Sequence, residues 1–330
     1  MFKNEVVCGD NLEVMRKMPD ESVHAVITSP PYFVNMPYET IKKGEDIWRN
    51  WNRYMDELLY PTFREAFRLL KPGGHLWINI DDSHTSVKSE LKKNIALPTH
   101  AALTVELSKY MDYKEMVLWK KIRGKKTSGG SGMMMGSFGR FGSPGSIPIV
   151  QEVEYILWFK KPGLRKDLND KVRKGSALSK EEFKEWGMQI WNVQPARAKS
   201  VGHPAPFPIE IPRRCIKLST FKGDTILDPF GGASTTALAA IDTERNYTTI
   251  DLDPEYCKLG EKRIADFIEE RDNPLQPELP FESDKKKTSK KKVIQKRSGP
   301  SLDAMLNAEQ TTIHTEPGTR RIVKLVKKKK

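Results

Sequence analysis

Residues 225–236 read Thr225-Ile226-Leu227-Asp228-Pro229-Phe230-Gly231-Gly232-Ala233-Ser234-Thr235-Thr236. A short apolar run ends here in a carboxylate, an aromatic ring and two glycines, and an apolar helical stretch follows at 237–241. A second strand-like run, 247–253, again ends in acidic residues. Strand, glycine turn, helix and strand together predict a βαβ unit, which places its two strands in a parallel sheet covered by helices.

The turn of this unit favours a particular kind of ligand. Glycines let the backbone approach a ligand closely, although Gly231-Gly232 alone would indicate no more than a tight turn. Asp251 ends the next strand, where a carboxylate can accept hydrogen bonds from a ribose diol. The stretch does not match G-x-G-x-x-G, and Asp228 would repel a pyrophosphate. Asp228 and Phe230 suit a ligand that carries a positive charge and an adenine ring.

A second motif lies two hundred residues earlier, where the strand-like run 24–28 stops at Ser29-Pro30-Pro31-Tyr32. Consecutive prolines cannot continue a strand ladder, so the chain turns rigidly. The turn holds the Ser29 hydroxyl and the Pro30 carbonyl in fixed directions, and Tyr32 adds an aromatic surface. Open α/β sheets bind their ligands at such strand ends. Taken alone, the motif is equally consistent with an ordinary proline turn.

The remaining pattern to residue 274 predicts one α/β domain. Further strands are expected at 5–10, 75–80, 115–120 and 153–160, and helices at 11–17, 51–70, 97–110, 209–219 and 254–271. Pro61 should kink the helix 51–70, and Lys71-Pro72-Gly73-Gly74 should end it. Asp253-Pro254-Glu255 is a favourable helix start. The strands 115–120 and 153–160 are expected to be antiparallel neighbours.

Two segments do not follow this pattern. Residues 122–147 contain eight glycines and no periodicity, which indicates either a mobile functional loop or a disordered insertion. Residues 161–200 are basic and include Trp186 and Trp191. That mixture suits phosphate and base contacts, so the segment is a candidate target-recognition region, but it could equally be a surface excursion.

The net charge of +13 is concentrated at the end of the chain. Residues 284–330 hold fifteen Lys or Arg and four Asp or Glu, a balance of +11. Residues 275–330 are therefore expected to be a basic, disordered tail that either contacts a polyanion such as nucleic acid or only aids solubility.

Other features place the chain in the cytoplasm. No apolar run approaches the ~20 residues that cross a membrane, and the first residues do not resemble a signal peptide. The three cysteines, Cys8, Cys215 and Cys257, form no C-x-x-C pair. We expect them to be reduced core thiols and expect no metal site.

The order of the two motifs, Thr28-Ser29-Pro30-Pro31-Tyr32 before Asp228-Pro229-Phe230-Gly231-Gly232, resembles one enzyme family over roughly residues 4–270. The family is the S-adenosylmethionine-dependent DNA amino-methyltransferases, which act on cytosine N4 or adenine N6, in their circularly permuted β arrangement. The resemblance implies a Rossmann-like class I fold, doubly wound, with a seven-stranded sheet that is parallel except for one strand. It also implies double-stranded DNA as partner, a cognate restriction endonuclease as a candidate partner, and a monomer or homodimer.

The resemblance assigns roles to residues of the cofactor site. Phe230, Gly232 and Ser234 belong to the turn that wraps the methionine part of the cofactor, with Ser234 in place of a glycine. The other residues implied to bind cofactor are Asp228, Asp251 at the ribose, Asp10 near the adenine, and His203 and Pro206 in the segment 203–208 that closes on the methionine end.

The resemblance implies that Ser29, Pro30, Pro31 and Tyr32 are catalytic. The Ser29 hydroxyl and the Pro30 carbonyl would accept hydrogen bonds from the target amine, and Tyr32 would stack on a base flipped out of the duplex. Serine at the first position points to cytosine N4, with adenine N6 as the alternative. The absence of a Pro-Cys motif argues against cytosine C5 chemistry. Methylation of RNA or protein, or a catalytically idle binding module, are less favoured alternatives.

Overall fold

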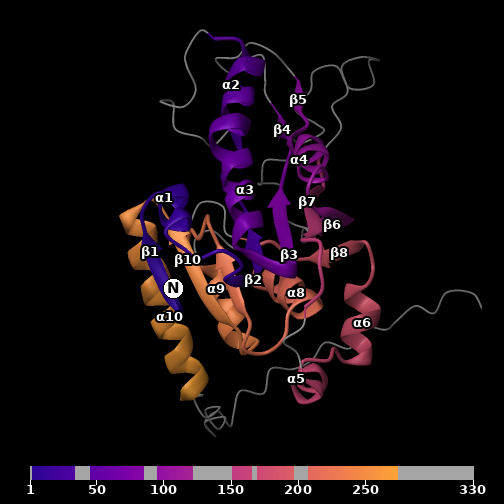
Figure 1. The fold of residues 1–330 in the computed structure, drawn as a ribbon, viewed down its shortest axis with the longest axis vertical. Helices are drawn as coiled ribbons and strands as arrows, with labels where there is room; N and C mark the ends of the chain where they lie inside the picture. The colour runs from indigo at the N-terminus through magenta and orange to yellow at the C-terminus, as the bar shows by residue number, and fades with distance from the viewer. Residues whose placement is uncertain are drawn as a thin grey trace, which may run out of the picture. The chain divides into compact units, whose positions relative to one another are not determined.

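The computed structural model describes residues 2–33, 45–84, 95–121, 151–165, 169–196 and 207–273. In these ranges one eight-stranded sheet has the order β1-β10-β9-β2-β3-β7-β6-β8 (Figure 1). Its strands are β1 Glu5–Cys8, β2 Val23–Thr28, β3 Leu70–Ile80, β6 Asp112–Lys121, β7 Val153–Lys160, β8 Ile190–Val193, β9 Thr225–Asp228 and β10 Asn246–Asp251. A separate antiparallel pair consists of β4 Ser83–His84 and β5 Ala96–Leu97.

The sheet is parallel except for β7, which runs antiparallel to both of its neighbours, β3 and β6. The single antiparallel strand and the pairing of β6 with β7 confirm two predictions. The count of seven is one short, because β8 adds to the edge beside β6 with Trp119 opposite Trp191. With only four residues and a polar flank, β8 carries too little periodicity to be recognised in the sequence.

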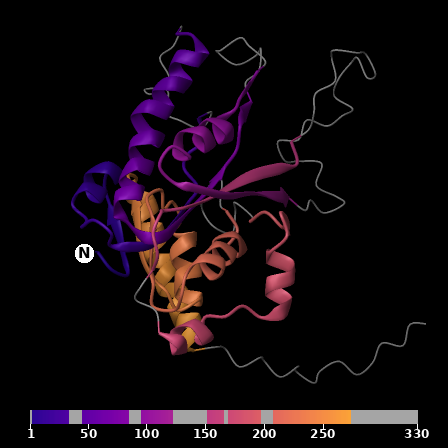
Figure 2. The same cartoon turned by 45° about the vertical axis from the view of Figure 1, so that its right-hand side comes forward.

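Helices cover both faces of the sheet, which is the doubly wound arrangement (Figure 2). One core packs under α1 Asn11–Arg16, α3 Tyr60–Leu69 and α4 Thr99–Leu107, and the other under α8 Glu210–Ser219, α9 Thr235–Asp242 and α10 Pro254–Asp272. Two short helices, α5 Asp170–Gly175 and α6 Lys180–Trp186, precede β8. The expected start of α10 is confirmed: the Asp253 carboxylate accepts a hydrogen bond from the Glu255 amide at 2.8 Å.

The helix predicted at 51–70 is interrupted as expected, although before Pro61 rather than at it. It consists of α2 Ile47–Tyr54, a π-helical turn η2 Met55–Leu59, and α3. Proline has no amide hydrogen, so the turn before it can widen without losing a hydrogen bond to that position. The predicted end of this helix before Lys71-Pro72-Gly73-Gly74 is confirmed, because α3 ends at Leu69. The next strand begins earlier than expected, since β3 starts at Leu70 rather than at His75.

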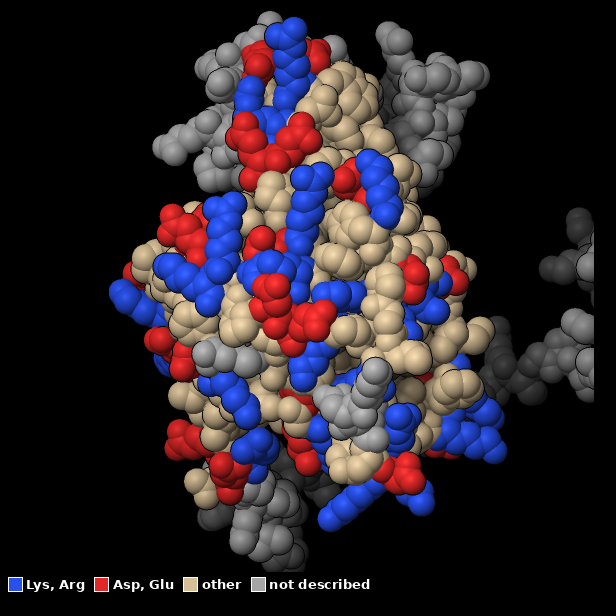
Figure 3. All heavy atoms as spheres, in the orientation of Figure 1, with Lys and Arg blue, Asp and Glu red and all other residues tan. Residues whose placement is uncertain are grey.

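The structure also bears on the expectations about cysteines, membrane spans and charge. Cys215 and Cys257 are buried free thiols, but Cys8 is exposed, so its assignment to the core is wrong. No helix in the described ranges is long and apolar enough to span a bilayer. Figure 3 shows acidic and basic side chains interspersed over one face of the described residues, which agrees with the small net charge expected before residue 284.

Candidate active site

The two sequence motifs meet at the carboxyl edge of the sheet. Strands β2 and β9 are parallel neighbours, with Val26 opposite Leu227. At their ends the Thr28 hydroxyl donates a hydrogen bond of 2.6 Å to the Asp228 carboxylate. This buried bond joins residues two hundred positions apart and places the Ser-Pro-Pro-Tyr turn beside the Gly231-Gly232 turn. Thr28, which was not among the predicted site residues, is therefore the link between the two halves of the site.

Asp228 is a buried carboxylate that has no cationic partner in the part of the chain that the structure describes. Its side chain is 3 % exposed and also accepts a hydrogen bond from the Phe230 amide at 3.1 Å. No Lys, Arg or His nitrogen of the described ranges lies within 4 Å of it. Burial raises the pKa of Asp228 to about 6, against the opposing effect of its hydrogen bonds. A carboxylate held in this state is suited to a positively charged ligand.

The glycine turn after β9 is packed too closely for any other residue. A Cβ at Gly231 would lie 1.9 Å from the Thr249 hydroxyl oxygen, so the turn can rest on β10 only if residue 231 is glycine. Gly232 has φ of 49° and donates its amide hydrogen to the Asp251 carboxylate at 2.7 Å. Asp251 thus fixes the turn and stands at the end of β10, as predicted.

The neighbouring strand end brings Asp10 to the same edge. Strand β1 pairs with β10 so that Cys8 lies opposite Asp251, and the Gly9 amide donates to the Asp251 carbonyl at 2.9 Å. The Asp10 side chain is exposed and caps α1 by accepting from the Glu13 amide at 2.9 Å. Asp10, Asp251 and the glycine turn therefore lie along adjacent strands.

Ser234 and Phe230 complete the turn in different ways. Ser234 is buried, and its backbone is in the left-handed conformation. Its hydroxyl occupies the space that a Cβ at Gly260 of α10 would need. This hydroxyl therefore faces α10, so Ser234 contributes mainly through the backbone. Phe230 is half-buried and packs against the core beneath the site.

The Ser-Pro-Pro-Tyr turn is held by contacts from three elements. The Pro31 carbonyl accepts a hydrogen bond from the Tyr54 hydroxyl at 2.8 Å. The Tyr32 hydroxyl donates to the Glu154 carboxylate at 2.9 Å, and burial together with Glu154 raises the pKa of Tyr32 well above its usual value. Tyr32 is thus a neutral donor with a fixed ring, and Ser29 is half-buried beside it.

Three polar residues that we did not predict as site residues surround Ser29 and Tyr32. The Asn79 amide nitrogen lies 3.3 Å from the Ser29 hydroxyl, 3.2 Å from the Tyr32 hydroxyl and 2.9 Å from Glu154. Lys121 forms an ion pair with Glu154, which balances the charge of that buried carboxylate. Asn79 is a polar residue inside the otherwise apolar run 76–80, and this interruption could have identified it as a site residue.

Asp81 follows directly after β3 at this edge. The Gln151 side chain donates a hydrogen bond to its carboxylate, and the Asp82 amide donates another at 2.9 Å. Burial, reinforced by the nearby Glu154 carboxylate, raises the pKa of Asp81 to about 7. Its position at the end of a central strand is the same signal that identified Asp10 and Asp251.

Several predicted residues lie elsewhere. His203, Pro206, the segment 122–147 and the tail 275–330 lie outside the described residues. Trp186 and Trp191 are buried, at 7 % and 1 % exposure, and so cannot contact a base in this structure. Arg165 binds Asp224 at the opposite edge of the sheet. The aromatic part of the expected recognition region is therefore wrong.

The sequence profile of the DNA methylase family, which covers N6 and N4 enzymes, matches residues 23–262. The chain belongs to this family. The enzyme is 32% identical to the Type II methyltransferase M.MjaI of Methanocaldococcus jannaschii, over 79% of this chain and 91% of that protein. It is 28% identical to the Type II methyltransferase M.BglI of Bacillus subtilis, over 94% and 98% of the two chains.

Solved structures agree with this assignment. TTHA0409 of Thermus thermophilus, determined in complex with S-adenosyl-L-methionine, has a TM-score of 0.65 and 32% identity, over 80% of this chain and 94% of that one. PvuII DNA methyltransferase, at 19% identity and a TM-score of 0.56, shares the fold. The enzyme is thus an S-adenosylmethionine-dependent DNA methyltransferase. Asp228, which is buried and has no ion-pair partner among the described residues, and the close-packed Gly231 fit a site for this cationic cofactor.

Proposed function

We propose that the enzyme methylates the exocyclic N4 of cytosine in double-stranded DNA, with adenine N6 as the alternative product. The observation that carries the proposal is Ser29, a neutral hydroxyl at the end of β2, where it lies against the Asn79 amide. Because its relatives are Type II methyltransferases, we expect a short DNA sequence as target and a cognate restriction endonuclease as partner.

The chain prepares the target amine for reaction by accepting its hydrogens. The lone pair of an exocyclic amine is delocalised into the base, which makes it a poor nucleophile. Ser29 Oγ and the Pro30 carbonyl oxygen can each accept one N–H bond, so the lone pair is directed away from both. S-adenosylmethionine supplies an electrophilic methyl group when it is bound. The contribution of the protein is then positioning and electrostatics, and no covalent intermediate is required.

Tyr32 holds the base after it leaves the duplex. Its hydroxyl is fixed by Glu154 and Asn79, so the ring can offer a pre-oriented stacking surface at little entropic cost. Lys121 holds the Glu154 carboxylate in place through their ion pair. We assign Glu154 and Asn79 to positioning, since neither needs to contact the reacting atoms.

The cofactor contacts follow from the strand ends. Asp228 would face the positive charge of the cofactor, Asp251 would bind its ribose hydroxyls and Asp10 would lie near its adenine. Phe230 and Gly232 would shape the turn around it. His203 and Pro206, which lie outside the described residues, stay predicted contacts of its methionine end. Target recognition by residues 122–147 and the exposed parts of 161–200 also stays a prediction.

Nucleoside analysis of host DNA tests this proposal. Genomic DNA from a methylation-free host that expresses the enzyme is digested and analysed by mass spectrometry. N4-methylcytosine is expected, and it should be absent from a host that expresses Asp228→Asn. N6-methyladenine without N4-methylcytosine would overturn the cytosine assignment, and modified RNA with unmodified DNA would overturn the DNA substrate.

A further inference from the structure

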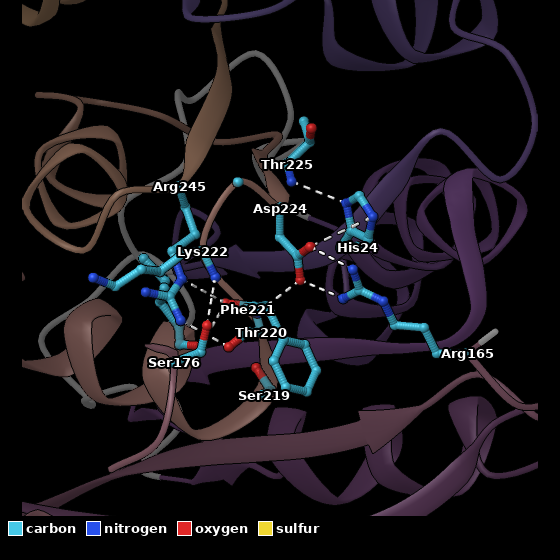
Figure 4. A network of polar contacts seen from close by, with 12 residues as sticks. His24, Arg165, Ser176, Ser219, Thr220, Phe221, Lys222, Asp224, Thr225 and Arg245 are labelled. Carbon is cyan, nitrogen blue, oxygen red and sulfur yellow. Dashed lines mark hydrogen bonds and ion pairs between the residues drawn. The ribbon is translucent and has the colours of Figure 1, made fainter. Parts of the chain in front are cut away.

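A polar pocket lies at the amino edge of the sheet, opposite the candidate active site. It has a volume of about 510 Å³ and is formed by the starts of β2, β3 and β6, the end of β7, the chain that follows β7, helix α5 and the end of α8. Figure 4 shows part of its wall, where His24, Arg165, Ser219 and Phe221 gather around Asp224. None of these residues belongs to the proposed catalytic or cofactor site.

Among the described residues that line this pocket, the Lys and Arg side chains have no acidic counterpart. The lining residues include the five cations Lys71, Lys114, Lys160, Arg165 and Arg173 and no Asp or Glu. Arg165 forms an ion pair with Asp224 and contacts its carboxylate through both guanidinium Nη atoms. Lys114, Lys160 and Arg173, in contrast, form no ion pair with any residue of the described ranges. Three cations that line one concavity, none of them held in an ion pair within the described ranges, give the pocket a positive potential that attracts an anion.

His75, which also lines the pocket, has a pKa that is affected by the same positive charges. His75 lies opposite Lys160 in the sheet register. Burial lowers the pKa of His75 to about 4, with further lowering by the charges of Lys160, Lys114 and Arg165. Its Nδ1 accepts a hydrogen bond from Trp158 Nε1 at 3.1 Å, so the neutral ring carries its hydrogen on Nε2 as a donor.

Two aspartates lie close to this pocket without lining it. Asp112 is opposite Lys160 in the sheet register, but the two form no ion pair. The oxygens of buried Asp224 are already occupied by Arg165 and by the Phe221 amide at 2.8 Å. At the end of α8, Ser219 and Thr220 donate their hydroxyls to the Cys215 and Ile216 carbonyls at 2.6 Å each. The negative end of that helix is therefore partly satisfied before any ligand arrives.

We propose that this pocket binds the phosphate group of a small phosphorylated molecule, at a site separate from DNA and cofactor. Lys and Arg are the usual partners of phosphate, and Lys114, Lys160 and Arg173 supply three such groups within one concavity. Trp158 lines the same pocket with one ring face stacked on Trp77. A nucleotide, whose base could pack against this indole, is therefore tested beside inorganic phosphate. The site lies at the amino edge of the sheet, where ligand binding would leave the catalytic edge open.

Calorimetry on the full chain tests the proposal, with S-adenosylhomocysteine at saturation to fill the cofactor site. The probes are inorganic pyrophosphate, uridine 5′-monophosphate and uridine. We expect the monophosphate to bind at least tenfold more tightly than uridine. Binding of pyrophosphate would show that the phosphate group alone suffices. Tighter binding of uridine 5′-monophosphate than of pyrophosphate would identify a nucleotide as the preferred ligand. Failure of both phosphorylated probes to bind would overturn the proposal.

Paired variants assign the binding to this pocket. Lys160→Met/Arg173→Gln should weaken phosphate binding at least tenfold. The matched pair Lys109→Met/Arg271→Gln should not, because Lys109 is exposed just after α4 and Arg271 is exposed on α10. Asp228→Asn should also keep phosphate binding, which separates this site from the proposed function. If the pocket pair weakened DNA binding instead, the surface would be a DNA contact and the proposal would be wrong.

A measurement on the unaltered protein guards against misfolded variants. A phosphate anion beside His75 must raise the pKa of that imidazole, which can be followed by the NMR shift of its ring protons. An upward shift with saturating pyrophosphate is expected. An unchanged His75 titration would contradict binding in this pocket.

Discussion

Asp224 directly precedes strand β9 and Asp228 ends it, and both side chains are 3 % exposed. Asp224, at the amino edge, is held by the Arg165 guanidinium, by the Phe221 amide at 2.8 Å, and by His24 with its Nε2 at 3.6 Å (Figure 4). Asp228, at the carboxyl edge, accepts hydrogen bonds from Thr28 and from the Phe230 amide, and no cation of the described ranges reaches it.

The difference separates structural from functional carboxylates. A buried charge is normally paired, because desolvation is costly otherwise. Asp224 meets this requirement within the fold and so stabilises it. Asp228 does not, and its raised pKa means that the fold bears a cost for keeping the carboxylate there. The cationic cofactor of the family would supply the missing partner.

Removing the charge of each aspartate should have opposite consequences. Asp224→Asn leaves Arg165 without its carboxylate, so the free energy of unfolding should fall by about 3 kcal/mol or more, the usual cost of breaking a buried pair. Asp228→Asn should leave stability unchanged or slightly raised at pH 7, because no cation loses a partner. Urea unfolding of both variants measures this, and equal losses of stability would remove the distinction.

Hydroxyls at the two edges offer a second contrast. Ser29→Ala should lower kcat about 100-fold, as for loss of one oriented acceptor or donor in an active site, with stability nearly unchanged. Ser219→Ala removes the acceptor of the Trp77 indole hydrogen bond, 3.0 Å long, at the amino edge. It should cost about 1 kcal/mol of stability and leave kcat unaltered. Steady-state kinetics and urea unfolding distinguish the two patterns, and full activity of Ser29→Ala would refute the role of Ser29.

Close packing should make the glycine turn at the carboxyl edge intolerant. Gly231→Ala would press its Cβ against the Thr249 hydroxyl, costing about 1–3 kcal/mol as overpacking does. Adding Thr249→Ala should restore part of the loss. Gly175→Ala on α5 meets open space and should change the midpoint of thermal unfolding very little. A tolerated Gly231→Ala would show that the turn can move away from β10.

The smallest expected effects are changes of stability and of cofactor affinity with pH, which follow from the ionisation of Asp228. Because the pKa of Asp228 is raised to about 6 in the folded chain, its carboxyl keeps a proton that the unfolded chain loses nearer pH 4. Its contribution to stability therefore falls as pH rises from about 4 to 6, and Asp81 extends that fall to about 7. The affinity for the cationic cofactor should change in the opposite direction. It should increase about tenfold from pH 5 to 7, because the cofactor needs the ionised form of Asp228. Calorimetry on Asp228→Asn should show no such tightening.

Much of this architecture was accessible from the sequence, because motifs at strand ends are local. The runs that end in Asp10, Ser29, Asp228 and Asp251 predicted both the strands and their shared edge. Contacts across the sheet were not accessible, since no local pattern pairs Thr28 with Asp228 or Asn79 with Glu154. Trp191 was misassigned for a related reason: in a four-residue strand, alternation cannot distinguish a core tryptophan from an exposed one.

The most direct test of the account compares two ligands on two variants. Calorimetric Kd values are measured for S-adenosylmethionine and for 5′-methylthioadenosine, which lacks both positive charges of the cofactor, with Asp228→Asn and Asp224→Asn. We predict that Asp228→Asn weakens S-adenosylmethionine about 100-fold, in the range for losing one partner of a buried charge pair, and weakens methylthioadenosine less than threefold. Folded Asp224→Asn should bind both ligands normally. Equal weakening of both ligands by Asp228→Asn, or no weakening, would contradict the claim that Asp228 is kept unpaired for the charge of the cofactor.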